Sequence, residues 1–389
     1  MPSMPGRRFA IVAPNFYPRI CGVGDHSALL AAELRRRGLG VRIFTRSPTG
    51  HHPASPDLDV YGTSSRFPTL AAQDIFEHIR ADQPTDALIQ YTPQMWDAWR
   101  FGSPALVWLT GRLRKLGLRT TLIAHELYVP WKPRPDLAMA AALQRLQFIA
   151  LLRNCDRVFV TTRSRAAAIS TFCALFRIAK PEVIPVGPNA VPVDSVRPLH
   201  DRPPISPKIG LFSTAAVGKR FDVVLGAFEE IARQFPSAEL VLLGDLGPAD
   251  QPRVVAIRNA IARHPAAKRI RQTGRLSLAE IARELALLDL YLFPMETGAN
   301  TRSGTLPAAL GSGVPVIATR GRETDGLFRH DENLVFADTM SATAFAAAAL
   351  RLLRDPVLSK KIGDGGRDLY QGHMTWERTA DQLLADPSS

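Results

Sequence analysis

The sequence of 389 residues has few cysteines and no long apolar run. Its three cysteines, Cys21, Cys155 and Cys173, are odd in number and far apart, so they indicate neither a disulfide framework nor a zinc site. A reducing compartment, the cytoplasm, is therefore expected. No stretch of about 18 uncharged apolar residues is present, which argues against a transmembrane helix. The run FAIVA ends at Pro14 and is too short for a signal peptide, so it predicts a first buried strand.

Two kinds of functional motif are also missing. No histidines or cysteines have the spacing of metal ligands, so we expect no bound metal and no cofactor. Gly22 and Gly24 flank Val23 where the first helix is predicted to begin, but position 27 is Ser27, so the G-x-G-x-x-G pattern is incomplete. A dinucleotide-dependent oxidoreductase is disfavoured, and the glycine pair indicates an anion or substrate loop of another kind.

Positive charge is confined almost entirely to the first half of the chain. Residues 1–200 hold 25 Lys and Arg against 14 Asp and Glu, whereas residues 201–389 hold 23 against 22. The excess either decorates solvated surfaces or forms a face for an anionic partner, such as a phospholipid surface, a lipid pyrophosphate or an acidic saccharide. Nucleic acid is disfavoured as a partner, because aromatic residues do not alternate with the basic runs and no nucleic-acid motif is present.

Apolar runs rich in Val, Ile and Leu alternate with helical segments along both halves. They predict strands at 9–13, 41–45, 86–91, 120–125, 157–161 and 182–186, and again at 208–213, 238–244, 269–274, 289–294 and 314–319. This alternation predicts parallel sheets covered by helices on both faces. Six prolines within residues 187–207 predict a linker between two such domains. The fold class is therefore α/β, with two Rossmann-like doubly wound parallel sheets.

Ligands of such sheets bind beyond the carboxyl ends of the strands, so the loops there are the candidate sites. After strand 289–294, the loop that contains Arg302 leads into a helix beginning at Gly304. The small residues Ser303, Gly304 and Thr305 allow a ligand to approach the helix start, which attracts phosphate, and Arg302 suits phosphate oxygens. The alternative is an ordinary glycine-rich turn between two strands.

Two more side chains follow predicted strands. Lys219 lies in the loop after strand 208–213, where a lysine reaches a diphosphate as a point charge. The alternative is a solvated lysine. His125 ends strand 120–125, and this position favours ligand binding over core packing. Asp25 is the predicted N-cap of the first helix.

Segments of the sequence resemble, in the right order, the family 4 retaining glycosyltransferases with the GT-B fold. They are GVGDHSALLAAELRRRG, HE at 125–126, GKRFDVVLGAF, VLLGD, TGRLSLAEIARELALLDLYLFP and GTLPAALGSGVPVIAT. The resemblance implies an acceptor domain of residues 1–200 and a nucleotide-sugar donor domain of residues 201–374, which face one another across a cleft. A last helix at 375–386 is expected to pack back on the first domain.

The resemblance also implies roles for individual residues. On the donor, Lys219 and the backbone of 304–306 would meet the diphosphate, and 274–276 would meet the base. The donor-binding set is Ser213, Thr214, Lys219, Gly274, Arg275, Leu276, Asn300, Arg302, Ser303, Gly304, Thr305 and Leu306. The acceptor and phosphate loop is Gly22, Val23, Gly24, Asp25 and Tyr91. The catalytic set is His125, Lys219, Glu296 and Arg302, with His125 beside the transferred sugar.

The sequence departs from the family pattern at two places. The family has two glutamates eight positions apart around the last of these helices, and alignment places Asn300 and Ala308 there. Thr214 stands where the family has an arginine five positions before the lysine. Arg302 and Glu296 are the residues expected to compensate.

The expected function is transfer of a sugar, with retention, from a nucleotide sugar to an acceptor hydroxyl. The acceptor is expected to be a lipid-linked or other anionic saccharide of envelope polysaccharide assembly, or a small molecule. The alternatives are a catalytically silent GT-B-fold sensor, motivated by the missing glutamates, and a nucleotide-sugar epimerase. A peripheral position on the inner face of the membrane is also expected. Residues 105–120 carry Leu106, Leu109, Leu113 and Leu116 at helical spacing beside four basic residues, which predicts a helix lying on the lipid. The alternative is a helix that buries these leucines against the sheet.

Overall fold

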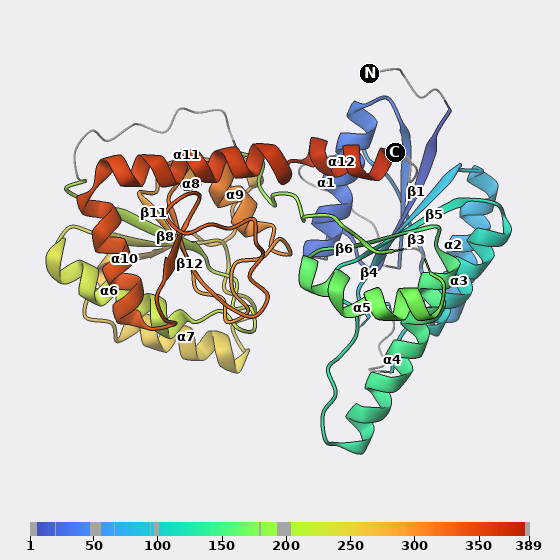
Figure 1. Cartoon of the computed structure of the whole chain (residues 1–389), viewed down its shortest axis with the longest axis horizontal. Coiled ribbons are helices and arrows are strands. Elements are labelled where there is room, and N and C mark those ends of the chain that lie inside the picture. Colours follow the sequence, from blue (N-terminus) through green and yellow to red (C-terminus); the bar gives the residue numbers. More distant parts are fainter. Residues whose placement is uncertain are drawn as a thin grey trace. The chain divides into compact units, whose positions relative to one another are not determined.

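The computed structural model describes residues 6–19, 21–46, 56–65, 67–93, 95–96, 101–178, 180–192 and 204–385. The chain divides into two compact units, residues 1–186 with 376–389 and residues 187–375 (Figure 1). The boundaries predicted from the sequence lay after residues 200 and 374. Of the expected linker, residues 193–203 lie outside the described residues, and residues 187–192 belong to the second unit.

The first unit contains a seven-stranded sheet in the described part of the chain. Its strands are β1 (Arg8–Ala13), β2 (Gly40–Thr45), β3 (Asp59–Gly62), β4 (Asp86–Tyr91), β5 (Arg119–Ala124), β6 (Arg157–Val160) and β7 (Glu182–Val183). Their order is β3-β2-β1-β4-β5-β6-β7, and every neighbouring pair is parallel. The sequence analysis missed β3, a short half-buried edge strand without an apolar run. The strand order reverses between β1 and β4, which places the switch point at the ends of these two strands.

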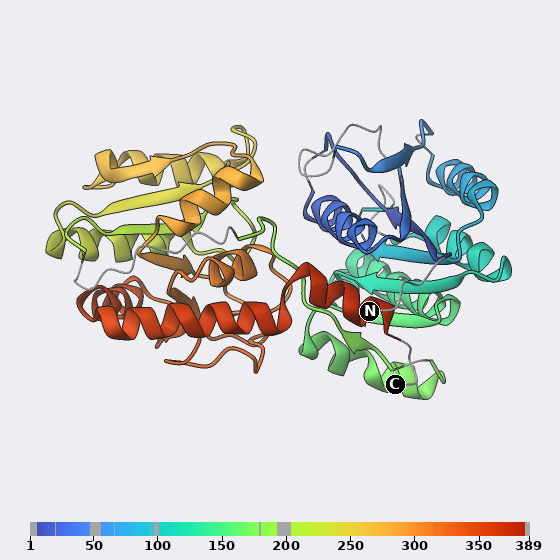
Figure 2. The same ribbon diagram turned by 90° about the horizontal axis from the view of Figure 1, so that it is seen from above.

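Helices cover both faces of this sheet (Figures 1 and 2). They are α1 (Gly22–Arg36), α2 (Pro68–Asp82), α3 (Pro104–Lys115), α4 (Pro135–Asn154), α5 (Arg163–Leu175) and α12 (Trp376–Leu384). The prediction that Asp25 caps the first helix is wrong, because α1 already begins at Gly22 after Cys21 and Asp25 lies in its first turn. An acidic side chain there still faces the positive end of the helix dipole.

The helix expected to lie on a membrane is α3, and the prediction about its leucines is wrong. Leu106, Leu109 and Leu113 are completely buried in the core of the first unit, and only Leu116, just after the helix, is exposed, at 42%. The same spacing that would place them on a lipid surface places them against the sheet, and burial of large apolar side chains stabilises the fold by about 1.5–3 kcal/mol each. This side of α3 is therefore not available to a membrane.

The last helix, α12, is fastened to the first unit at both ends. Trp376, its first residue, packs its ring against the ring of His26 at a centroid distance of 5.0 Å. Arg37, directly after α1, forms an ion pair with Asp381 at 2.7 Å. At the carboxyl end, the buried guanidinium of Arg157 donates to the carbonyl oxygens of Gln382, Leu383 and Ala385 at 3.1, 3.0 and 2.7 Å. Arg157 thereby satisfies carbonyl groups that a helix end leaves without partners.

The second unit repeats the same topology. Its strands are β8 (Lys208–Phe212), β9 (Glu239–Leu243), β10 (Ile270–Gln272), β11 (Leu290–Phe293), β12 (Val316–Thr319) and β13 (Val335–Ala337), in the order β10-β9-β8-β11-β12-β13. All pairs are parallel. Its helices are α6 (Phe221–Gln234), α7 (Pro252–Ala262), α8 (Leu278–Ala286), α9 (Thr305–Gly311), α10 (Ala342–Arg354) and α11 (Pro356–His373), with the 3₁₀ turn η1 (Ala267–Arg269). The switch point lies between β8 and β11. The sequence analysis missed β13, which is only three residues long.

Candidate functional site

In the second unit, the loops that follow β8 and β11 at the switch point pair with each other. Lys219 and Met295 form an isolated antiparallel bridge. The amide of Glu296 donates to the carbonyl of Gly218 at 2.9 Å. Gly218 has a φ of +81°, a conformation that is unfavourable for a residue with a side chain. This pairing fixes the position of the Lys219 backbone at the carboxyl end of the sheet.

Lys219 is the most buried basic side chain among the predicted donor residues. Only 8% of the residue is exposed, and its Nζ donates to the carbonyl of Phe212 at 2.8 Å. Burial, reinforced by the positive charge of Arg253, lowers the pKa of the Lys219 ammonium to about 8. One carbonyl oxygen does not replace the water that this buried ammonium has lost. An anion beside Lys219 would stabilise its positive charge and accept further hydrogen bonds.

Arg253 is a second cation at this place, and the sequence analysis missed it. It lies in the first turn of α7, and its Nη2 donates to the carbonyl of Lys219 at 2.7 Å. No local pattern marks Arg253, because it comes 34 residues after Lys219 and is brought back by α7. The one sequence signal for Arg253 was its place directly after Pro252, since proline is common at the first position of a helix.

The loop after β11 is held by its own side chains. Asn300 is 3% exposed, its Nδ2 donates to the carbonyl of Gly298 at 3.0 Å, and its Oδ1 accepts from the amide of Arg302 at 3.2 Å. The hydroxyls of Ser303 and Thr305 are hydrogen-bonded to each other at 2.8 Å. Asn300 therefore shapes the loop from inside, and the half-buried Arg302 side chain lies on that loop.

Gly304 precedes α9 and is closely covered. A Cβ at this position would overlap Oδ1 of Asn189 and lie 3.1 Å from the carbonyl oxygen of Gly187, and the Asn189 amide donates to the Gly304 carbonyl at 3.0 Å. Within α9, Leu306 and Ala308 are completely buried in the core of the second unit. Ala308 fills the position of the second family glutamate with an apolar contact. The Leu306 side chain also faces this core, so only its backbone remains for the predicted donor role.

The remaining predicted donor residues line the same carboxyl edge. Thr214, Gly274 and Arg275 are exposed and Leu276 is half-buried. Gly244 and Gly274 form an isolated antiparallel bridge. Ser213 is 1% exposed and its hydroxyl already donates to the Leu243 carbonyl at 2.9 Å. Glu296 is exposed and lies 3.9 Å from the guanidinium of Arg220.

In the first unit, His125 lies directly after β5, at the carboxyl edge. It is 8% exposed, and its Nε2 is 2.6 Å from Oε1 of Gln90 on β4. Burial, and next the charge of Arg165, lowers the pKa of His125 to about 4, so the ring is neutral at pH 7. A glutamine oxygen can only accept, so Nε2 carries the proton and Nδ1 is the acceptor nitrogen of the ring.

His26 of α1 packs edge-on against His125 at a centroid distance of 4.8 Å. It is 3% exposed, and neither of its ring nitrogens has a hydrogen-bond partner among the described residues. Nε2 of Gln90 and Oγ1 of Thr92 are also buried and have no hydrogen-bond partner among the described residues. Buried polar atoms of this kind call for a water or ligand group to complete their bonding. Sequence reasoning missed His26 and Gln90, because one lies on a helix and the other inside a strand.

The other first-unit predictions divide into two groups. Gly22 is exposed with open space around it, whereas Gly24 is buried, and a Cβ on it would lie 3.0 Å from the carbonyl oxygen of Asn15. Val23 is buried and Asp25 half-buried in the same turn. The structure removes Tyr91 from the site. Its ring is 2% exposed in the core and its hydroxyl donates to the Leu127 carbonyl at 3.2 Å.

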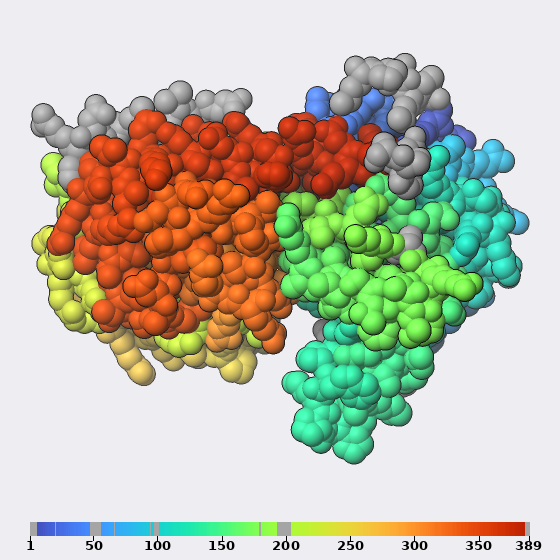
Figure 3. All heavy atoms as spheres, in the orientation of Figure 1, coloured from blue at the N-terminus to red at the C-terminus, as the bar shows by residue number. Residues whose placement is uncertain are grey.

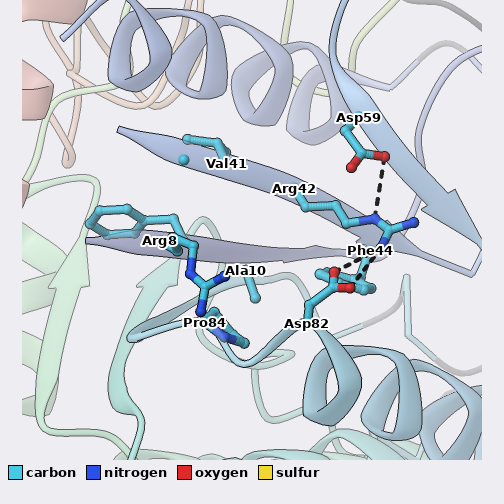
Figure 4. Close-up of a pocket in the computed structure, with 10 residues that line it drawn as sticks. Arg8, Ala10, Val41, Arg42, Phe44, Asp59, Asp82 and Pro84 are labelled. Carbon is cyan, nitrogen blue, oxygen red and sulfur yellow. Dashed lines mark hydrogen bonds and ion pairs between the residues drawn. The ribbon is translucent and has the colours of Figure 1, made fainter. Parts of the chain in front are cut away.

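A hollow of about 230 Å³ lies at the opposite edge of the first sheet, among the first residues of β1, β2 and β3. Figure 4 shows Arg42 in it, between Asp59 at 3.2 Å and Asp82 at 2.8 Å. Because two carboxylates compensate this guanidinium, and because doubly wound sheets bind ligands at the other edge, we assign no ligand to it. In the part of the chain that the structure describes, no group of three or more His, Cys, Asp or Glu side chains could hold a metal ion.

Comparison with known proteins gives two family matches. Residues 20–194 match the model described as Glycosyltransferase Family 4, and residues 206–355 match Glycosyl transferases group 1. A D-inositol 3-phosphate glycosyltransferase from Segniliparus rotundus is 26% identical over 414 residues, covering 97% of this chain and 88% of its own.

Solved structures share the fold. A sucrose-phosphate synthase from Thermosynechococcus elongatus has a TM-score of 0.72 at 18% identity, covering 97% of each chain. The Anabaena protein HepE, in complex with UDP and glucose, has a TM-score of 0.71 at 14% identity, covering 97% of this chain and 98% of its own.

Proposed function

Because this chain belongs to the family 4 glycosyltransferases with the GT-B fold, we propose that it transfers a sugar, with retention, from a nucleoside diphosphate sugar to an acceptor hydroxyl. The observation that carries the assignment of the donor site is Lys219, a buried ammonium at the switch point of the second sheet with a pKa of about 8. Perturbed cations in such positions are typical of functional sites. The donor proposed is a UDP-sugar, as in the HepE complex with UDP and glucose.

The proposed reaction breaks the bond between the anomeric carbon and the diphosphate oxygen. The acceptor oxygen forms the new bond on the same face of the sugar, and its proton passes to the leaving diphosphate. Lys219, Arg253 and Arg302 stabilise the negative charge that develops on the leaving group, together with the backbone at 304–306. In this proposal no metal ion is required.

His125 has a different part in the proposed reaction. With a pKa of about 4 its ring stays neutral, so it acts as a hydrogen-bond partner of a sugar hydroxyl rather than as an acid. The proton on Nε2 is engaged by Gln90, which leaves Nδ1 to accept from that hydroxyl. Glu296, exposed on the loop after β11, remains a predicted catalytic carboxylate.

We propose an anionic acceptor that carries a phosphate group, such as a lipid-linked intermediate of envelope polysaccharide assembly at the inner face of the membrane. Two observations support it. The positive excess lies in residues 1–200, not in the donor half. The names of two relatives also contain a phosphate ester, D-inositol 3-phosphate and sucrose-phosphate.

A panel of UDP-, GDP- and dTDP-sugars tests the proposal, with and without EDTA and without acceptor. Slow hydrolysis of one donor to free nucleotide, unchanged by EDTA, is the expected result. A donor converted to its epimer would instead indicate an epimerase, and tight binding with no turnover would indicate a sensor. Loss of hydrolysis in EDTA would contradict the metal-free mechanism.

A further inference from the structure

Helix α4 carries apolar side chains on two opposite sides. One side is buried in the first unit, through Ala140, Ala141, Phe148, Leu151 and Leu152. On the opposite side, Met139, Leu143 and Leu146 are 52, 37 and 64% exposed. Their spacing of four and three residues puts them on one stripe of the helix. The side opposite the core of a surface helix is normally polar, so this exposed apolar stripe indicates a partner that covers it.

The loop before α4 continues this surface. Trp131 is 59% exposed, and the guanidinium of Arg145 lies 5.0 Å from its ring centroid and 4.1 Å from that of Tyr128. Arg145 also donates to the Val129 carbonyl at 3.2 Å, so these contacts hold the exposed indole in place. In Figures 1 and 3, this loop and the first turns of α4 project from the rest of the first unit.

The charges beside the stripe are almost all positive. Residues 127–154 contain Lys132, Arg134, Arg145 and Arg153 but a single acid, Asp136, which Arg134 pairs with at 3.4 Å. Lys132 is exposed in the same projecting loop as Trp131. An apolar stripe with tryptophan and a basic flank matches the boundary of an anionic bilayer, where acyl chains meet negative headgroups.

We propose that Trp131, Met139, Leu143 and Leu146, here called the α4 face, dock the protein on an anionic phospholipid surface. In the described residues no helix is long and apolar enough to cross a membrane. The α4 face takes over the role that sequence reasoning gave to α3, whose leucines are buried. Met139 and Leu146 reach the acyl boundary while Lys132 and Arg134 meet the headgroups.

This inference deepens the proposed function, since it places the acceptor half at a surface that carries lipid-linked substrates. Docking requires neither donor nor turnover. Vesicle binding without sugar transfer would therefore refute the proposed reaction alone, and transfer to a soluble acceptor without vesicle binding would refute the docking alone.

The test is cosedimentation with vesicles of equal parts phosphatidylglycerol and phosphatidylcholine at low salt. The wild type is expected to bind, and Met139→Ser with Leu146→Ser to bind at least about tenfold more weakly, since the change removes two apolar side chains from the acyl boundary. The matched control is Phe67→Ser with Leu70→Ser, at α2 of the same unit, which are 68 and 52% exposed and lie outside the α4 face. The control is expected to bind as the wild type does.

A second measurement locates the contact. Vesicles with brominated acyl chains should quench tryptophan fluorescence, and Trp131→Phe should remove most of that quenching while the other four tryptophans remain. The proposal is overturned if the wild type does not bind at low salt, or if the Met139 and Leu146 variant binds as well as the control. A dimer that this variant dissociates, without vesicle binding, would also overturn it and would identify the face as a contact between copies.

Discussion

The two units of the chain share one topology and carry opposite chemistry at the same edge. In both sheets the strand order reverses next to the first strand, and the loops at this switch point follow the carboxyl ends of the strands. In the first unit these ends hold the neutral, buried imidazoles of His26 and His125. In the second they hold the cations Lys219 and Arg253. The fold decides where a ligand sits, and a few side chains decide whether its charge or its hydroxyls are recognised.

The largest effect should come from removing the charge of the second unit. Lys219→Ala is expected to lower kcat/KM by roughly 10²–10³, as loss of one preorganised charge-stabilising donor does in other enzymes. Steady-state kinetics with the donor found in the panel measures this. Full activity of Lys219→Ala would refute the assigned donor site.

Arg220 provides the control for this variant. It is adjacent in sequence but only half-buried, and its guanidinium pairs with Asp222 at 2.5 Å and lies 3.9 Å from Glu296, whereas the Lys219 ammonium is buried. Arg220→Ala is expected to change kcat/KM by less than about threefold, because surface ion pairs contribute little. Equal losses in both variants would mean that general positive charge, and not the buried ammonium, matters.

The second prediction concerns the imidazoles of the first unit and pH. The folded pKa of His125 is about 4, below its unfolded value, so the unfolded chain binds more protons as the pH falls below 6.5. Stability is therefore full above about pH 6.5 and declines toward pH 4, by about 3 kcal/mol from His125. Burial also lowers the pKa of His26, which adds to the decline.

Fluorescence makes this measurement specific to the first unit. All five tryptophans, at positions 96, 99, 108, 131 and 376, lie in residues 1–186 or 376–389. Urea unfolding followed by tryptophan emission at pH 7 and pH 4.5 should show the loss, and His26→Phe should reduce it. A free energy of unfolding that does not depend on pH in this range would mean that the two rings are not buried neutral.

The smallest effect lies on the alkaline side and belongs to the second unit. As the pH rises through about 8, Lys219 loses its proton, and kcat/KM for the donor should fall about tenfold for each pH unit. Lys219→Arg stays charged, so its kcat/KM should be lower but flat from pH 7 to pH 9.5. A wild-type profile that is equally flat would show that the lysine charge does not govern donor capture.

Much of the fold could be predicted because strands such as β1, from Phe9 onward, and β11 are continuous apolar runs that only a doubly covered sheet buries. The sequence did not reveal β3, which is a half-buried edge strand without such a run, or β13, whose apolar run is only three residues long. The loops of the site were predictable as strand ends. Side chains that reach the site from helices, His26 and Arg253, were not, since sequence distance does not reveal which helix turn faces a strand end.

The leucines of α3 and the exposed stripe of α4 show a second limit. Both helices have apolar residues at helical spacing, and the pattern alone does not tell which set faces the sheet. Tertiary packing decides it, because α4 is apolar on two sides and only one of them can meet the core.

The attachment of α12 has a consequence for the order of synthesis. Residues 187–375 form the second unit from one continuous stretch, so a ribosome can deliver that unit whole. The first unit begins earlier yet lacks Trp376 and the carbonyls bonded by Arg157 until the second has been made. During translation, residues 1–186 of the first unit are therefore made first but leave His26 and one face of α1 uncovered. The first unit is complete only after α12 has been synthesised. A chaperone that recognises exposed apolar surface on the nascent chain would find it there.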